Sequence, residues 1–151
     1  MAPAQALTPK IDQLIALFNA RSLDVPDGLF DRKTQFCLNG APFETLLGQP
    51  PDDALVLMLA RGAAGYRFAT KALQHAVPDV AIERGDVVTT GDPFHATAKL
   101  WLSGHLRDSG ESIDTIVSVA LQFAPAGWVA VADASVEAAS LERLRTARIA
   151  P

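Results

Sequence analysis

The stretch from 94 to 134 constrains the fold most, because its residues alternate between two faces and leave one face poor in bulky side chains. Phe94–Arg107 and Ser112–Phe123 are predicted to form two long antiparallel strands around the turn Asp108-Ser109-Gly110-Glu111. A two-residue loop at Ser109-Gly110 would set their register. Because side chains alternate along a strand, this register places five pairs on one face: Leu106 with Ile113, Gly104 with Thr115, Leu102 with Val117, Leu100 with Val119 and Ala98 with Leu121.

A third strand is predicted after the connection Ala124-Pro125-Ala126-Gly127, and after Trp128 it adds only small side chains to the same face. The expected pairs are Phe123 with Trp128, Leu121 with Ala130, Val119 with Ala132 and Val117 with Ala134. A sheet face that lacks bulk either accepts a closely packed helix or leaves room for a ligand. If it leaves room, the expected lining residues are Leu100, Leu102, Thr115, Val117, Val119, Trp128 and Ala132.

Two helices are predicted in the first half of the chain, with a short hairpin between them. Thr8 can cap the first helix, with Pro9 at its first position and an apolar stripe that ends at Phe18. Thr34–Asn39 alternates as a strand does, and Asn39-Gly40 indicates a tight turn. Ala41–Leu47 then returns either as a strand or as a short helix. The second helix begins after Gly62 and ends before Pro78.

The second half of the chain adds strands and a final helix. Val80–Val88 is predicted to be a strand interrupted at Arg84-Gly85, and the three strands described above follow it. The tail from Ser135 to Ile149 is expected to be helical, with Leu141 and Leu144 as its anchors. This order predicts an α+β fold in which a curved antiparallel sheet wraps around the N-terminal and central helices as a cone-shaped, cystatin-like roll.

Length and charge narrow the class of protein. A chain of 151 residues predicts a single domain, 1–151, with residues 1–7 as a loose tail and residues 135–151 as the C-terminal helix. The formal net charge of -4 argues against a nucleic-acid partner. The sequence shows neither a membrane-spanning apolar run nor a signal pattern, so we expect a cytoplasmic protein. Cys37 is the single cysteine, which excludes an internal disulfide.

This order of elements resembles the nuclear transport factor 2-like superfamily, which includes ketosteroid isomerases, scytalone dehydratase, polyketide cyclases and limonene epoxide hydrolase. The resemblance covers roughly residues 9–136. Its motifs are Arg61-Gly62-Ala63-Ala64-Gly65-Tyr66-Arg67-Phe68 at the start of the central helix and Phe123-x4-Trp128 at the last hairpin. It implies a deep apolar pocket between sheet and helices, acid–base chemistry without a cofactor, and in many members a dimer through the outer sheet face.

The chain departs from the catalytic patterns of those families. The strand position of the oxyanion-hole acid in ketosteroid isomerases falls on Val119, and the position of their base falls near Asn39, an amide that cannot abstract a proton. Asp133 could match the last-strand acid of the epoxide hydrolases, but Lys99 and Trp101 stand near their other two catalytic positions. The resemblance therefore implies the fold and the pocket, and neither known set of catalytic residues.

Six polar residues are the candidates for chemistry. The predicted register pairs His105 with Asp114 on the outer face, where a carboxylate could orient an imidazole base; a plain cross-strand polar pair explains the same pattern. Tyr66 and Arg67 start the central helix near its positive end, where they could polarise a carbonyl or hold a phenolate. Asp31 near the expected opening could act as a base, and Asn39 could orient a substrate oxygen, although an Asn-Gly turn accounts for Asn39 as well.

Metal binding is not expected. The histidines at 75, 95 and 105 match no ligand spacing, and the two on one strand face lie too far apart to chelate together. Trp101, Ile116, Ala120 and Val131 share the outer sheet face in the predicted register, and this half-apolar face suggests a subunit interface of a homodimer.

The function predicted from these observations is that of a lyase or isomerase without a cofactor. It would act on an apolar, aromatic small molecule by proton transfer that leads to dehydration, cyclisation or carbon–carbon cleavage, including formaldehyde release from a lignin-derived aryl diol. Two alternatives stay open. One is a non-catalytic ligand-binding or dimerisation module of the same fold, and the other is a hot-dog thioesterase, which would need at least one more strand.

Overall fold

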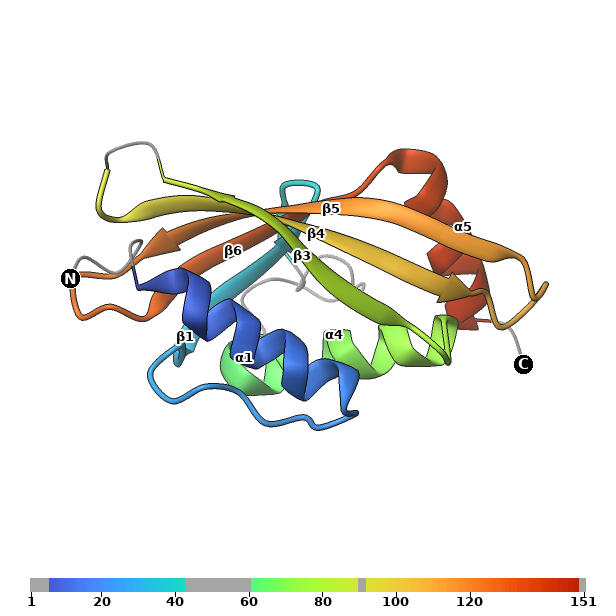
Figure 1. Ribbon diagram of the computed structural model, residues 1–151, viewed down its shortest axis with the longest axis horizontal. Coiled ribbons are helices and arrows are strands. Elements are labelled where there is room, and N and C mark those ends of the chain that lie inside the picture. The colour runs from blue at the N-terminus through green and yellow to red at the C-terminus, as the bar shows by residue number, and fades with distance from the viewer. Residues whose placement is uncertain (1–5, 43–60, 90–91, 150–151) are drawn as a thin grey trace.

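The computed structural model describes residues 6–42, 61–89 and 92–149, and these form one curved sheet with helices against it (Figure 1). The helices are α1 (Leu7–Asn19), α4 (Gly62–Ala76) and α5 (Ala138–Ile149). The strands are β1 (Phe30–Leu38), β2 (Ala41–Pro42), β3 (Ala81–Val88), β4 (His95–His105), β5 (Ser112–Phe123) and β6 (Val129–Ser135).

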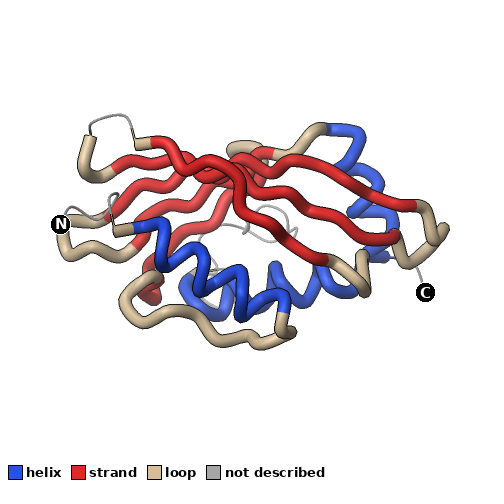
Figure 2. The backbone as a smooth tube through the Cα atoms, viewed as in Figure 1, coloured by secondary structure: helices blue, strands red, loops and turns tan. Residues whose placement is uncertain are grey.

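The six strands lie in the order β2-β1-β6-β5-β4-β3. All neighbours are antiparallel except β1 and β6, which run parallel. Helices α1 and α4 lie on the same side of the sheet, and α5 stands at the end of the long strands (Figure 2). The predicted α+β roll is therefore confirmed, with one parallel pair that the sequence did not indicate.

Several predicted boundaries shift. Helix α1 starts at Leu7 with Ala6 at its N-cap and no side-chain cap, so the predicted cap at Thr8 is wrong. Leu7 is only 1% exposed, so it belongs to the core rather than to a loose tail. Helix α5 begins at Ala138, three positions after the predicted start. Of the predicted 41–47 segment, Ala41–Pro42 is a strand and the rest lies outside the described residues.

The turn between β4 and β5 has four residues, 107–110, rather than two. The backbone N–H of Leu106 donates to the carbonyl of Glu111 (2.8 Å), and Gly110, at φ +71°, donates to the carbonyl of Leu106 (2.8 Å). A longer loop slides the two strands by two residues, which leaves every side chain on its predicted face. The observed pairs are Gly104 with Ile113, Leu102 with Thr115, Leu100 with Val117, Ala98 with Val119 and Ala96 with Leu121.

The pairing of β5 with β6 slides in the same way. Phe123 pairs with Val129 and not with Trp128, and the register is irregular between Gln122 and Phe123. The pairing of Phe123 with Val129 shifts the register by one position, and the extra residue at the irregularity shifts the rest by one more. Leu121 consequently pairs with Ala132, and Val119 pairs with Ala134. The alanines keep their predicted face.

Two hydrophobic clusters hold the helices against the concave face of the sheet. The first, which we call the α1 cluster, consists of Leu7, Ile11, Leu29, Phe36, Ala96, Ala98, Leu121, Phe123, Val129 and Ala132. The second, the α4 cluster, consists of Phe18, Ala76, Val77, Val80, Leu102, Leu106, Ile113 and Ala147. Leu7 and Ile11 of α1 share the first cluster with Ala96, Ala98 and Ala132, so a helix covers the small-residue face at that end.

Candidate active site

The middle of the concave face is less tightly covered than its two ends. Along β4, Leu100 is half-buried, whereas Ala98 and Leu102 on the same face are 1% and 4% exposed. On β5, Val117 and Val119 are also half-buried. Leu100 and Val119 pack against the edge of the α1 cluster, and Val117 packs against the edge of the α4 cluster. We call this half-buried stretch of the inner sheet face, formed by Leu100, Val117, Val119 and Ala134, the central hollow.

The predicted lining residues divide between the hollow and the core. Leu100, Val117 and Val119 border the hollow. Leu102 and Ala132 belong to the two clusters, and Thr115 on the same inner face is 7% exposed. Trp128 is half-buried in the turn that precedes β6.

Tyr66 projects from the second turn of α4 into the packed interior. Its ring lies 5.6 Å from the ring of Phe30, which in turn makes an edge contact with Phe36 at 5.2 Å. The Tyr66 hydroxyl is buried and has no hydrogen-bond partner among the described residues. Burial raises the pKa of this hydroxyl above its ordinary value of 10.0. Thr70 offsets part of that rise in pKa, although the two hydroxyls do not meet in hydrogen-bonding geometry.

Gln74 continues the same stripe of α4. Tyr66, Thr70 and Gln74 are spaced by four residues and so lie along one side of the helix. The Gln74 Nε2 atom is also buried without a partner among the described residues. A buried donor without an acceptor costs about 1–3 kcal/mol. Two such donors on one helix side therefore mark a place where a ligand could supply acceptors.

A cleft of about 690 Å³ opens where β1 meets the start of α4. Its described lining residues are Phe30, Asp31, Arg32, Lys33, Arg61, Ala63 and Ala64. Phe30 joins this cleft to the aromatic group of Phe36 and Tyr66. We call it the β1–α4 cleft. It lies directly beside the Tyr66 ring.

Asp31 lies at this cleft, near the opening where the sequence predicted it. Its half-buried carboxylate accepts a hydrogen bond from the backbone N–H of Lys33 through Oδ2 (3.1 Å). Its own N–H donates to Thr34 Oγ1 (2.9 Å), and that hydroxyl donates to the carbonyl of Val129 (2.6 Å). The start of β1 is thereby fixed against β6, and Oδ1 of Asp31 has no hydrogen-bond partner among the described residues.

Three other predicted candidates lie away from the hollow. Asn39 holds a turn: at φ +50° its Oδ1 accepts from the N–H of Val136 (2.8 Å). Arg67 is exposed on α4. Asp114 is exposed and pairs with Ser103, so the predicted partnership of His105 with Asp114 is wrong.

His105 instead bonds to Asp79, a partner that no sequence pattern indicated. His105 Nδ1 lies 2.6 Å from Asp79 Oδ2, and the His105 N–H donates to Asp79 Oδ1 (2.7 Å). These bonds hold the pKa of Asp79 below its usual value. Asp79 follows the proline that ends α4, 26 residues before His105, and no spacing rule connects the two. Both side chains are more than half exposed, outside the hollow.

The outer face of the sheet carries a second histidine–aspartate pair and a smaller groove. His95 Nδ1 lies 2.7 Å from Asp92 Oδ2, and the pKa of Asp92 is lowered by the Phe94 N–H and by His95. His95 borders a groove of about 220 Å³, which Thr97, Gln122 and Asp133 also line. Within the described ranges, no three His, Cys, Asp or Glu side chains gather in a way that could hold a metal ion.

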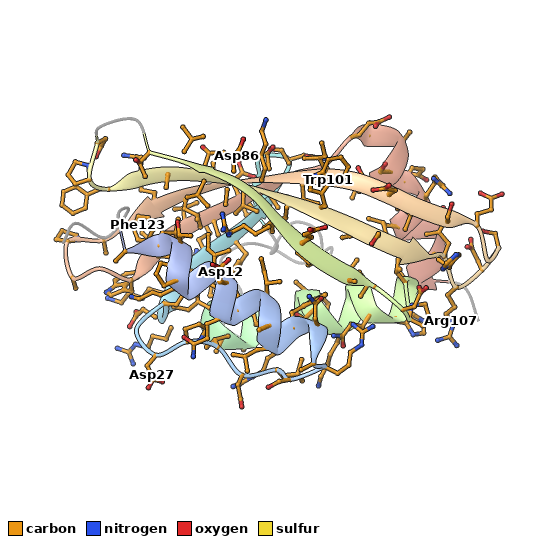
Figure 3. All side chains as sticks on the ribbon, in the orientation of Figure 1. Asp12, Asp27, Asp86, Trp101, Arg107 and Phe123 are labelled. Carbon is orange, nitrogen blue, oxygen red and sulfur yellow. The ribbon has the colours of Figure 1, made fainter. Side chains whose placement is uncertain are left out.

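Trp101 and Ile116 pair directly on the outer face and are 46% and 43% exposed. Figure 3 shows Trp101 on the side of the sheet away from α1 and α4. Ala120 and Val131 fall on the same face, as predicted. No described helix is long and apolar enough to cross a membrane.

Solved structures of other proteins share this fold. A SnoaL-like polyketide cyclase from Agrobacterium tumefaciens is 17% identical with a TM-score of 0.64, and the match covers 91% of this chain and 95% of that one. TsrD from Streptomyces laurentii is 17% identical with a TM-score of 0.66, over 95% and 96% of the two chains. An NTF2-like protein of unknown function from Exiguobacterium is 12% identical with a TM-score of 0.59, over 85% and 98%.

These likenesses show that the chain has the cone-shaped NTF2-like fold, as the sequence resemblance implied. No protein-family description matches the sequence, and no curated protein matches it either. At such low identity the fold is what the likeness establishes.

Proposed function

We propose that this protein is a cofactor-independent enzyme that binds an apolar, aromatic small molecule in the central hollow and moves a proton on it. The buried, unpartnered hydroxyl of Tyr66 beside an apolar surface is the observation that carries the proposal. The shared fold with a SnoaL-like polyketide cyclase supports a cyclase, isomerase or lyase in general.

In the proposed mechanism, Tyr66 donates a hydrogen bond to a substrate oxygen. Burial raises the pKa of its hydroxyl, so the hydroxyl stays protonated at neutral pH and acts as a donor. A donor already positioned in a site without water stabilises charge that develops on the oxygen, because no solvent has to reorganise. Tyr66 would thus serve as one donor of an oxyanion hole.

Asp31 is the proposed base. Its carboxylate would accept the proton from a carbon next to the substrate carbonyl, and the C–H electron pair would move onto the oxygen held by Tyr66. Reprotonation at another carbon completes an isomerisation. Loss of a leaving group completes a dehydration, and attack on a second carbonyl closes a ring. Release of formaldehyde from an aryl diol with hydroxyl groups on carbons 1 and 3 would begin at the terminal O–H, whose proton Asp31 would accept as the carbon–carbon bond breaks. The electron pair of that bond would form an alkene and expel the second hydroxyl group, which leaves as water with the proton returned by Asp31.

Solvent exchange tests the proton transfer whichever of these reactions the enzyme completes. Acetylnaphthalene in deuterated buffer should lose its methyl proton signal faster with the protein than without it, as followed by proton NMR. Tyr66→Phe and Asp31→Asn should each lower the catalysed rate by about a hundredfold. Asp24→Asn is the control, because Asp24 is exposed and lies in the loop before β1. Exchange no faster than in buffer, or equal in all variants, would reject the enzymatic proposal.

A second candidate is a ligand-binding and dimerisation module. It is favoured by the location of the histidines, since all three are exposed or half-exposed and neither ion-paired histidine faces the hollow. In either case we propose a homodimer through the outer face around Trp101 and Ile116. Sedimentation velocity should give a dimer for the wild type and a monomer for Trp101→Glu. A monomeric wild type would contradict the proposed homodimer for both candidate functions.

A further inference from the structure

Strand β1 is irregular where it pairs with β6. The pairing advances five positions along β1, from Phe30 to Gln35, and only two along β6, from Val129 to Val131. Three residues of β1 are therefore in excess at this point, and we call residues 31–34 the β1 bulge. Bulges redirect side chains and are frequent beside active sites. The bulge, rather than the alternation of the strand, thus sets the direction of the side chains within it.

The hydroxyl of Thr34 ties this bulge to the core. Its oxygen accepts a hydrogen bond from the backbone N–H of Asp31 (2.9 Å), and the hydroxyl donates one to the carbonyl of Val129 (2.6 Å). Thr34 and Val129 are both fully buried, and the N–H of Val129 donates in turn to the carbonyl of Leu29 (2.8 Å). A hydrogen bond in the interior is electrostatically stronger than one in water. The backbone of Asp31 is therefore fixed to a buried part of β6.

The bulge also fixes one oxygen of the Asp31 carboxylate. Oδ2 of Asp31 accepts a hydrogen bond from the backbone N–H of Lys33 (3.1 Å), two residues further along the chain. Aspartate side chains often bond in this way to the backbone two residues later, where the chain turns. Because Oδ2 is engaged and the Asp31 N–H is bonded to Thr34, the carboxylate has a preferred orientation. Oδ1 makes no hydrogen bond with a described residue, so it is the oxygen that could accept a proton.

Helix α4 holds the other side of the bulge. A Cβ at Gly62 would lie 2.9 Å from the carbonyl oxygen of Asp31 and 2.9 Å from Arg32 Cα, so the two backbones are in contact. Tyr66 follows Gly62 by four residues, which is about one helical turn along the same side of α4. The ring of Phe30, the residue before Asp31, lies 5.6 Å from the ring of Tyr66. These contacts hold the proposed base and the proposed hydrogen-bond donor at a fixed separation.

We propose that Thr34 is a positioning residue for the proton transfer and acts through Asp31. The inference rests on the proposed function, because it concerns the base of the same site. The Thr34 hydroxyl touches neither the substrate nor the reacting atoms, and it holds the Asp31 backbone where the bulge directs the carboxylate to the substrate. Loss of the hydroxyl frees Asp31 to shift. Because a misplacement of about 1 Å costs as much as about a hundredfold in rate, the shift slows proton transfer without weakening substrate binding.

Three variants separate this role from a general loss of stability. Thr34→Val nearly keeps the size of the side chain and removes both hydroxyl bonds, whereas Thr34→Ser keeps the hydroxyl. Ile113→Val is the matched control, because Ile113 is 2% exposed and belongs to the α4 cluster, which contains no residue of the bulge. Circular dichroism checks that each variant is folded. Proton NMR then gives the rate of solvent exchange at the methyl group of acetylnaphthalene, and fluorescence titration gives the dissociation constant of the same ketone.

Thr34→Val should exchange the methyl protons about tenfold more slowly than the wild type, because the base is displaced and not removed. Its dissociation constant for the ketone should be unchanged, since Tyr66 still donates to the ketone oxygen. Thr34→Ser should restore the rate of the wild type. Ile113→Val should change neither the rate nor the dissociation constant.

Equal exchange rates for Thr34→Val and the wild type would overturn the inference and leave the proposed function intact. The same fall in rate for Ile113→Val would overturn it as well, because the loss would then follow from stability. A Thr34→Ser variant as slow as Thr34→Val would mean that packing and not the hydroxyl matters. No catalysed exchange by the wild type would reject the proposed function together with the inference.

A second variant covers the case in which Thr34→Val does not fold. Lys33→Pro removes the backbone N–H that donates to Asp31 Oδ2, and it does so at an exposed position. This variant should also slow the exchange and leave the dissociation constant of the ketone unchanged. An exchange rate equal to that of the wild type would show that the bulge does not position the Asp31 carboxylate, and would overturn the inference.

Discussion

The two ends of α4 differ in how far their polar groups are hydrogen-bonded. At the C-terminal end, the N–H of Val77 donates to the carbonyl of Leu73 (2.8 Å), and the N–H of Arg107 donates to the carbonyl of Ala76 (2.8 Å). The guanidinium of Arg107 lies 3.0 Å from His75 Nδ1. Figure 3 shows Arg107 at this end of the molecule, beside the turn between β4 and β5. The hydrogen-bonded pair of Asp79 and His105 lies beside these contacts, with His105 two residues before Arg107.

At the N-terminal end the same helix lacks a cap, and Tyr66 keeps a buried hydroxyl without an acceptor among the described residues. Arg32 and Lys33 lie near that end and form no ion pair with any described residue. A polar group whose hydrogen bonds are complete has recovered the cost of leaving water, whereas an incomplete one lowers stability until a ligand binds. The difference separates a structural end of the helix from a functional one, although the sequence marked candidate residues at both.

The largest expected effect is the loss of the contact that forms the functional end. Gly62→Ala would place a methyl group 2.9 Å from the backbone of Arg32 in a left-handed conformation. The free energy of unfolding should fall by about 3 kcal/mol, because conformational strain and overpacking add. Urea unfolding measures this directly. Gly40→Ala is the control, since Gly40 also has a positive φ (+81°) but no atom near its Cβ position. Equal losses in the two variants would show that the β1–α4 contact is not tight.

Removal of a buried hydroxyl should change the free energy of unfolding in opposite directions, depending on whether that hydroxyl has a hydrogen-bond partner. Tyr66→Phe should raise the free energy of unfolding by about 1 kcal/mol, because it removes a buried donor that has no acceptor among the described residues. Thr34→Val should lower it by about 1–3 kcal/mol, because the fully buried Thr34 hydroxyl bonds to Val129 and Asp31. Thermal and urea unfolding of both variants give the comparison. A destabilised Tyr66→Phe would mean that the hydroxyl has a partner in the folded protein.

The smallest effect is expected at the structural end, and it depends on pH. The pKa of Asp79 is lowered in the folded state by its bonds to His105. The carboxylate therefore contributes stability above its unfolded pKa, and this stability is lost as the pH falls through the lower, folded value. Asp79→Asn should lower the melting temperature at about pH 7 and have less effect at about pH 3. Asp24→Asn should show no such difference. A loss for Asp79→Asn that is equal at both pH values would contradict the assigned bond.

The faces of the sheet could be predicted from the sequence, but the register could not. Alternation fixes which residues of β4 and β5 point inward, so Leu100 and Val119 lie on the predicted face. The partner of each residue depends on the loop, and Gly110 serves equally well in a two-residue or a four-residue turn. Both hairpins slid by two positions, which preserves the face and changes every pair. The partner assigned to His105 was wrong for this reason.

Site residues within a single helix or strand could be predicted from the sequence. Residues that are brought together by the packing of two elements could not. Tyr66 could be found because a helix start with an aromatic residue is visible in the sequence. The β1–α4 cleft could not, because its residues come from two elements that meet only through the packing of β1 on α4. Gly62 was the one local signal: a glycine at the first position of a helix permits close approach of another backbone.

The central claim is that the Tyr66 hydroxyl waits for an acceptor supplied by a ligand in the hollow. The direct measurement is the affinity of wild type and Tyr66→Phe for acetylnaphthalene and for isopropylnaphthalene, which has a similar shape but no oxygen. We predict that Tyr66→Phe weakens binding of the ketone about tenfold and leaves the hydrocarbon unchanged, the size expected for one buried hydrogen bond. Equal affinity of the two proteins for the ketone would contradict this claim.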